Sequence, residues 1–158
     1  LKISDNVGLN NEPEPELFYT SSMHGDELTG AILLLRLAEY LLSNYNNAAF
    51  PSVNRLIDEA ELWINPLANP DGTYYGGNGS VTSARRYNAN SVDINRNFPD
   101  PQDGEHPDAN PWQEETILMM QFAENHHFAL SANFNISLTT AGCLSATLVV
   151  SPTSVVNS

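Results

Sequence analysis

Apolar and polar positions along the chain divide it into segments with the periodicity of strands and helices. Residues 17–23 are aromatic and hydroxyl-rich, which is typical of a strand. In residues 27–44 the apolar positions recur every three or four residues and also fill the other faces, so the pattern predicts a heavily buried helix. Residues 53–60 have the pattern of a shorter helix, and residues 61–66 that of a strand that stops at a proline. The apolar positions of the long helix are Leu28, Ala31, Ile32, Leu35, Ala38 and Leu42, with Leu33, Leu34, Leu37 and Leu41 on its other faces.

The ends of the chain add further elements to this order. Residues 1–7 have the composition of a short strand, and residues 128–134 that of a buried one. Residues 111–125 begin with a proline and two glutamates, as a helix often does, and we interpret His126 and His127 as cations near its C-terminus. Strands that alternate with helices predict an α/β fold, a mixed central sheet flanked by helices. In such folds, functional loops follow the carboxyl ends of the strands.

Composition and charge exclude several classes of protein. The 158 residues, 41% of them hydrophobic, are enough for one core and give no strong case for two domains. The 19 acidic against 6 basic residues, a formal net charge of −13, argue against nucleic acid or an anionic membrane as a partner. No apolar stretch reaches membrane-spanning length, and the single cysteine permits no internal disulfide. The chain starts without a charged and then apolar leader, so we expect a fragment or a mature form.

One short motif follows the strand at residues 17–23. His24 and Glu27 offer an imidazole and a carboxylate three residues apart, a spacing at which both side chains can reach one small cation such as zinc. The same pattern arises by chance in many chains. The alternative interpretation is a helix start in which Asp26 and Glu27 complement the helix dipole, and both interpretations can hold together.

Two further segments carry candidate chemistry. Residues 69–72, with the sequence Asn-Pro-Asp-Gly, predict a tight turn, and taken alone they favour a plain surface turn. Arg85, Arg86 and Arg96 fall within twelve positions of a strongly acidic chain. They could merely pair with the surplus of acidic residues, but their place in loop sequence beside many asparagines favours an anion-binding site.

Taken together, these motifs resemble those of the zinc metallocarboxypeptidases of the carboxypeptidase A/B and D/E/N superfamily, and most closely the secreted bacterial-type members. The resemblance rests on His24-x-x-Glu27, on Asn69-Pro70-Asp71-Gly72, and on Arg86 placed nine residues before Asn95-Arg96-Asn97-Phe98, with Asp93 and Pro99 at the flanks. It covers residues 1–134, which correspond to the N-terminal part of the catalytic domain. Residues 135–158 form a tail that does not match the family.

The resemblance implies a role for each matching residue. His24 and Glu27 are implied ligands of one Zn²⁺ ion. Arg86 is implied to polarise the scissile carbonyl, which makes it both catalytic and substrate-binding. Asn95 and Arg96 are implied to clamp the C-terminal carboxylate of a peptide or protein substrate, which restricts cleavage to the last peptide bond.

The resemblance also places the family's third zinc ligand, a histidine, at Asn135, and an amide is a poor zinc ligand. No residue of the sequence can be assigned as the general base. We therefore expect a zinc-dependent carboxypeptidase, secreted or periplasmic, whose chain is an incomplete, altered or naturally truncated version of a longer enzyme. One alternative is a non-catalytic module that binds C-terminal carboxylates. Another is a zinc amidase or deacylase for small substrates, against which the arginine clamp argues.

Overall fold

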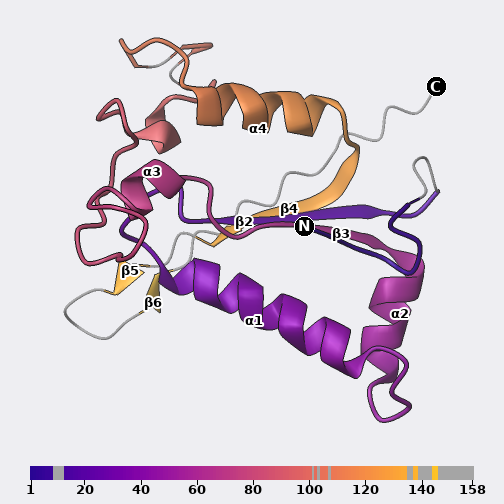
Figure 1. Cartoon of the computed structure of the whole chain (residues 1–158). Coiled ribbons are helices and arrows are strands. Elements are labelled where there is room, and N and C mark those ends of the chain that lie inside the picture. The colour runs from indigo at the N-terminus through magenta and orange to yellow at the C-terminus, as the bar shows by residue number, and fades with distance from the viewer. Residues whose placement is uncertain are drawn as a thin grey trace, which may run out of the picture.

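The computed structural model describes residues 1–8, 13–100, 102, 104–106 and 108–134, together with the backbone of residues 137–138 and 144–145. A twisted sheet forms the middle layer, with helix α1 (Thr29–Asn44) on one face and helix α4 (Glu114–Glu124) on the other (Figure 1). This arrangement confirms the expected α/β fold with a mixed sheet flanked by helices. None of the helices that the structure describes has the length and apolar content needed to span a bilayer.

The main sheet has four strands, and their order is β1-β3-β2-β4. Their bounds are Lys2–Ile3 for β1, Glu16–Ser21 for β2, Glu61–Asn65 for β3 and Phe128–Phe134 for β4. Strand β2 runs parallel to both β3 and β4, so that Tyr19 lies opposite Ile64 on one side and Ala132 on the other. Strand β1 runs antiparallel to β3. Two short strands, β5 (Ser137–Leu138) and β6 (Leu144–Ser145), pair with each other in a separate antiparallel ribbon.

The larger core lies between the sheet and helices α1 and α2 (Pro51–Glu59). Helix α1 contributes one stripe to it, in which Ala31, Leu34, Ala38 and Leu41 are buried at helical spacing. The buried residues of this core are Ile3, Leu34, Ala38, Leu41, Val53, Ile57, Leu62 and Ile64. Burial of such a set is the main favourable contribution to the stability of this half of the molecule.

The leucines of α1 predicted a helix that is heavily buried on all faces, and this prediction is wrong for the described chain. Ile32, Leu35 and Leu42 are 60%, 55% and 59% exposed. The fully buried positions of the helix form a single stripe, and Leu37 is partly buried against the same core, whereas Ile32, Leu35 and Leu42 lie on its exposed side. Apolar composition predicts the helix but does not say which of its faces is covered.

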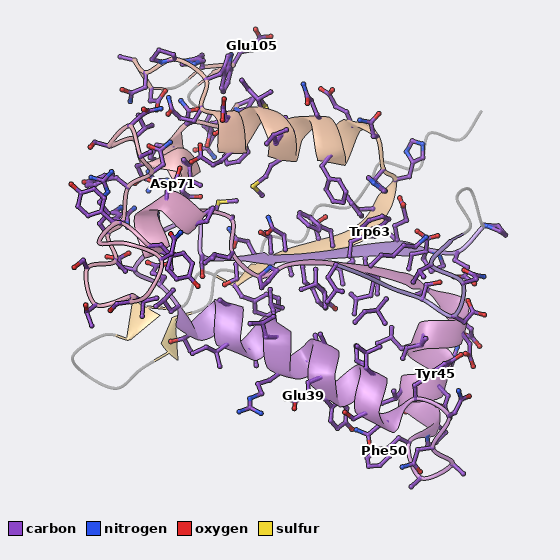
Figure 2. All side chains as sticks on the ribbon, viewed as in Figure 1. Glu39, Tyr45, Phe50, Trp63, Asp71 and Glu105 are labelled. Atoms are coloured by element: carbon purple, nitrogen blue, oxygen red, sulfur yellow. The ribbon has the colours of Figure 1, made fainter. Side chains whose placement is uncertain are left out.

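The opposite face of the sheet packs against α4 through aromatic side chains. Phe122 on α4 contacts Phe18, Trp63 and Phe128, with ring centroids 5.3–5.4 Å apart. Figure 2 labels Trp63 in this layer between the sheet and α4. His126 belongs to the same cluster and its Nδ1 lies 2.6 Å from Glu16 Oε1, so this side chain connects the starts of β4 and β2 instead of serving only as a cation at the end of α4.

Strand β4 is less buried than its sequence predicts. Only Phe128 and Ala132 are buried along it, and Ala129 is exposed. The strand lies at the edge of the four-stranded sheet, with β2 as its only neighbour among the described strands. An edge strand has fewer covering side chains than a central one, which explains the difference.

Candidate active site

The candidate residues gather where β2 and β3 end. Because these two strands are parallel neighbours, the loops that follow them leave the same edge of the sheet. The Ala68 N–H donates to Ser21 O at 3.0 Å and the Asn69 N–H to Ser22 O at 3.1 Å, so the second loop runs along the first. The short helix α3 (Pro70–Thr73) therefore lies beside His24, at the end of the molecule remote from α2 (Figure 1).

A tight turn brings His24 and Glu27 together. Ser22 has a φ of 55°, an uncommon value for a residue other than glycine, and its hydroxyl donates to Glu27 O at 2.8 Å. The Glu27 N–H donates to His24 O at 3.0 Å. As a result, His24 Nδ1 and Glu27 Oε1 lie 3.1 Å apart. Two ligand atoms bound to one tetrahedral zinc at about 2.1 Å lie about 3.4 Å apart, so the pair fits a shared zinc ion.

The surroundings of this pair also fit a cation. Glu27 Oε2 is buried and has no hydrogen-bond partner among the described residues. His24 is 5% exposed, and its Nε2 lies 3.2 Å from Asp93 Oδ1. A carboxylate on Nε2 keeps the proton there and leaves the Nδ1 lone pair facing Glu27, the arrangement found around histidine ligands of zinc.

A third protein donor is not present in the described chain. No group of three or more His, Cys, Asp or Glu side chains is arranged there to hold a metal ion. Asn135, the position at which the third ligand was expected, lies outside the described residues. The described residues thus supply two of the three protein donors that a catalytic zinc site uses.

Arg86 lies next to the histidine. Its Nε and Nη2 donate to Asp93 Oδ2 at 3.0 and 2.7 Å, and its Nη1 lies 3.3 Å from His24 Nδ1. Burial of the Asp93 carboxylate works to raise its pKa, but the hydrogen bonds and charge of Arg86 outweigh burial and hold the pKa below its ordinary value. The carboxylate is therefore ionised and fixes the guanidinium beside His24.

Asp93 also orients the segment that carries the expected clamp. Its Oδ1 accepts the Asn95 N–H at 3.1 Å and caps the short 3₁₀ helix η1 (Ile94–Arg96). One carboxylate thus contacts the expected metal ligand, the expected catalytic arginine and the start of the clamp. The sequence interpretation noted Asp93 only as a flanking residue. Its place as the N-cap of Ile-Asn-Arg is the local signal that could have identified it.

The three clustered arginines have different partners. Arg86 pairs with Asp93, whereas Arg85 donates from Nη2 to Asn88 O at 2.6 Å and Ala89 O at 3.1 Å. The guanidinium of Arg96 and the side-chain amide of Asn95 take part in none of the hydrogen bonds or ion pairs between described residues. In a chain of net charge −13, an exposed arginine that pairs with no described acidic side chain is available to an external carboxylate.

Buried asparagines that the sequence interpretation missed hold the arginine-bearing loops. Asn97 is fully buried; it donates to Asp108 Oδ1 at 2.9 Å and accepts the Gln113 N–H at 2.9 Å. Asn88 is 1% exposed and donates to Gln113 Oε1 at 2.9 Å. The segment that precedes α4 therefore anchors the loop from both sides. The abundance of asparagine was visible in the sequence, but the partners of each one were not.

The Asn-Pro-Asp-Gly segment is not the plain surface turn that it favoured when taken alone. It forms α3, in which Asn69 and Gly72 are buried and Asn69 caps the helix by accepting the Gly72 N–H at 2.8 Å. The turn lies against the loops that carry His24 and Arg86. Its burial reflects contacts with distant segments, which a local turn signal does not contain.

Comparison with known proteins agrees with this geometry. The sequence profile of the zinc carboxypeptidase family matches residues 1–141. The chain is 40% identical to carboxypeptidase D of Rattus norvegicus over 136 residues, which are 85% of this chain and 10% of that protein. It is 42% identical to the carboxypeptidase N catalytic chain of Mus musculus over 104 residues, 63% of this chain and 22% of that one.

The fold has solved counterparts. The crystal structure of carboxypeptidase A from Helicoverpa armigera superposes with a TM-score of 0.64 at 22% identity, covering 85% of this chain and 36% of that one. The chain thus spans between a tenth and little more than a third of the length of these relatives. The match of the family profile to most of the chain, together with the identity to carboxypeptidase D, confirms the resemblance found in the motifs. The chain belongs to the zinc carboxypeptidase family.

Proposed function

We propose that the protein is a zinc-dependent metallocarboxypeptidase that removes C-terminal residues from peptides or proteins. The observation that carries the proposal is the pair formed by His24 Nδ1 and Glu27 Oε1, 3.1 Å apart, with Arg86 Nη1 3.3 Å from the same nitrogen. The relatives named above are carboxypeptidases, and a metal ligand pair beside an arginine suits hydrolysis of an amide. The chain matches only 10% of the length of carboxypeptidase D, so the activity of the whole protein is proposed here and does not follow from that match alone.

His24 and Glu27 are the residues that hold one zinc ion per chain in this proposal. When bound, zinc supplies a Lewis acid that polarises a carbonyl group and activates water. The protein prepares the two ligands in advance. Asp93 orients the imidazole through Nε2. The buried Glu27 Oε2, which has no hydrogen-bond partner among the described residues, adds negative charge.

Arg86 supplies a hydrogen-bond donor beside the metal ligands. Asp93 takes two of its N–H groups and so fixes the plane of the guanidinium, while Nη1 faces His24. From this position Nη1 donates to the oxygen of the scissile carbonyl, on which negative charge grows during hydrolysis. A donor that is already oriented toward developing charge stabilises the transition state without further rearrangement.

Asn95 and Arg96 bind the substrate's C-terminal carboxylate. A guanidinium offers two parallel N–H groups to a carboxylate, and the neighbouring amide adds a donor. The bound carboxylate fixes the register of the substrate, so that the last peptide bond meets the metal site. A net charge of −13 suits a protein in a secreted or periplasmic setting, and we include that location in the proposal.

A second candidate is a non-catalytic module that binds C-terminal carboxylates. It is favoured because the part of the chain that the structure describes supplies two protein donors for zinc where a catalytic site uses three. The amide of Asn135 at the expected third position also favours it. A zinc amidase or deacylase for small substrates does not need Arg96. Substrate binding therefore separates these candidates from the carboxypeptidase.

The test compares peptides that differ only at the C-terminus. We expect binding of a peptide with a free carboxylate to weaken at least about tenfold in Arg96→Ala, because a charge-assisted bidentate contact is lost, while the amidated peptide is unaffected. The matched control is Arg55→Ala, an exposed arginine on α2 that pairs with Glu59, which should change neither affinity. Equal loss for both peptides in Arg96→Ala would contradict the clamp. Hydrolysis of the free peptide only in the presence of zinc would distinguish the enzyme from the binding module.

A further inference from the structure

Asn69 is a buried side chain that contacts both loops of the proposed site and belongs to neither. It follows β3 and caps α3, and its relative exposure is 0%. Its Nδ2 donates to Met23 O at 3.1 Å and to Arg86 O at 3.2 Å, and its Oδ1 accepts the Gly72 N–H at 2.8 Å. Both N–H groups of the amide and one lone pair are therefore in use.

The carbonyls that Asn69 holds lie next to the reacting groups. Met23 immediately precedes His24, and the second carbonyl belongs to Arg86 itself. One amide nitrogen thus connects the backbone that carries the metal ligand to the backbone that carries the arginine. These two segments lie 62 positions apart in the sequence, and their side chains meet at the 3.3 Å contact between His24 Nδ1 and Arg86 Nη1.

The backbones around Asn69 are in direct contact. The Gly25 N–H donates to Arg86 O at 3.3 Å, and Thr73 Oγ1 donates to Gly25 O at 2.8 Å. A Cβ atom added to Gly25 would lie 2.4 Å from Gly72 C and 2.4 Å from Thr73 N. No side chain separates the three loops here, so their spacing depends on the hydrogen bonds between them.

We propose that Asn69 is a positioning residue that fixes the Arg86 guanidinium relative to His24 and Glu27. The inference rests on the proposed function, since it gives Arg86 and the zinc ligands their roles. Asparagine suits this place because it offers two donors on one atom and an acceptor on the other. Serine retains an acceptor for the helix cap but has one donor, and aspartate places oxygen against two carbonyl oxygens.

The first test is a double-mutant cycle with Asn69→Ser and Arg86→Lys. The readout is the dissociation constant of dansyl-glycyl-alanyl-alanine with a free carboxylate, measured on the full chain with zinc present. We expect Asn69→Ser to weaken binding about tenfold when Arg86 is present and less than about twofold in the Arg86→Lys background, because both changes act on one contact. Equal losses in the two backgrounds would overturn the inference and leave the proposed function standing.

The second test reports on Arg86 without any substrate. Arginine Nε–H signals in ¹⁵N NMR identify Arg86 as the signal absent from Arg86→Lys. In the unaltered protein its Nε–H donates to Asp93 at 3.0 Å, so its exchange with water should be slow, and Asn69→Ser should accelerate it about tenfold. An unchanged Arg86 signal in Asn69→Ser would overturn the inference. If the signal changes but neither variant affects peptide binding, the positioning holds and the proposed function fails.

A matched variant separates positioning from general destabilisation. Ile57 is 3% exposed in the core between α2 and the sheet, and Ile57→Ala removes packing there without touching the loops. Unfolding in urea should show that Ile57→Ala is at least as destabilised as Asn69→Ser. Peptide affinity and the Arg86 signal should nevertheless stay unchanged in Ile57→Ala. A loss of affinity as large as that of Asn69→Ser would mean that Asn69 acts only through stability.

Discussion

Two parts of the molecule are held together by different interactions. Between α1, α2 and the sheet, the buried residues are aliphatic side chains such as Leu34 and Leu62, at 0% and 2% exposure. Around the loops at the ends of β2 and β3, equally buried positions hold Asn69, Asn97 and Asn88. The first part depends on non-directional burial of apolar area, and the second on hydrogen bonds with fixed partners.

The difference bears on function. Apolar packing tolerates changes of shape with a moderate loss of stability, and it places whole elements instead of single atoms. A buried amide fixes the position of each group that it bonds, because a broken bond leaves a buried polar group unsatisfied. The hydrogen bonds of the loops therefore position His24, Arg86 and Arg96. The aliphatic core stabilises the sheet from which these loops extend. Four changes separate these two contributions.

The largest effect is expected in the aliphatic core. Leu34→Ala should lower the free energy of unfolding by about 2–5 kcal/mol, since a fully buried leucine leaves a cavity. Urea denaturation measures this, and Leu33→Ala is the control because that neighbouring leucine is 46% exposed and should cost less than about 1 kcal/mol. Zinc and peptide affinities of the folded protein should stay unchanged in both. Similar costs for the two leucines would mean that α1 does not pack along a single stripe.

A smaller loss of stability with a loss of binding is expected at Asn97. Asn97→Ala leaves the buried Gln113 N–H without its acceptor and should cost about 1–3 kcal/mol. Because Asn97 directly follows Arg96, affinity for free-carboxylate peptides should also fall, which calorimetric titration measures. Asn44→Ala, at the end of α1, removes one bond to Tyr40 O and serves as control with intact affinity. Loss of stability without loss of affinity at Asn97 would refute the link between the buried amides and the clamp.

A loss of zinc affinity is expected at Asp93. Asp93→Asn removes the charge that orients His24 and should weaken zinc binding about tenfold. Competition with a chelating dye gives the affinity. Asp58→Asn, which affects a carboxylate paired with the Tyr45 hydroxyl at the far end of the molecule, should leave it unchanged. Figure 2 labels Tyr45 there, remote from Asp71 on α3. Unaltered zinc affinity in Asp93→Asn would remove Asp93 from the site.

The smallest effect is expected on the exposed face of α1. Leu35 is 55% exposed, so Leu35→Gln should change the free energy of unfolding by less than about 0.5 kcal/mol. Thermal and urea denaturation of the purified chain measure this change. A loss comparable to that of Leu34→Ala would show that something covers this face in solution.

The sequence predicted the elements of the aliphatic half well for a physical reason. Helical spacing of leucines and alanines sets where α1 runs, and the expected residues 27–44 compare with Thr29–Asn44. The same pattern did not reveal that Ile32 and Leu42 are exposed, because apolar character states a preference for burial and not the presence of a partner. Local sequence signals also predicted the next helix and strand, and the expected residues 53–60 and 61–66 are close to the observed α2 (Pro51–Glu59) and β3 (Glu61–Asn65).

In the polar half, the sequence indicated residues but few contacts. His24 and Glu27 meet because their separation is short and the turn between them is local. Asp93 and Asn69 were not assigned roles, since their partners lie 69 and 46 positions away in His24 and Met23. A single asparagine or aspartate in a loop gives no indication of which distant backbone it bonds. The family motifs supplied the roles of Arg86 and Arg96 that spacing alone could not.

Zinc stoichiometry tests the central claim most directly. The purified chain, dialysed against micromolar free zinc, is analysed for metal beside His24→Ala and His106→Ala, the latter an exposed histidine outside the site. The proposed function predicts about one zinc ion per chain in the unaltered protein and in His106→Ala, and none in His24→Ala. No retained zinc in the unaltered protein, or equal retention in His24→Ala, would contradict the assignment of His24 and Glu27 as its ligands.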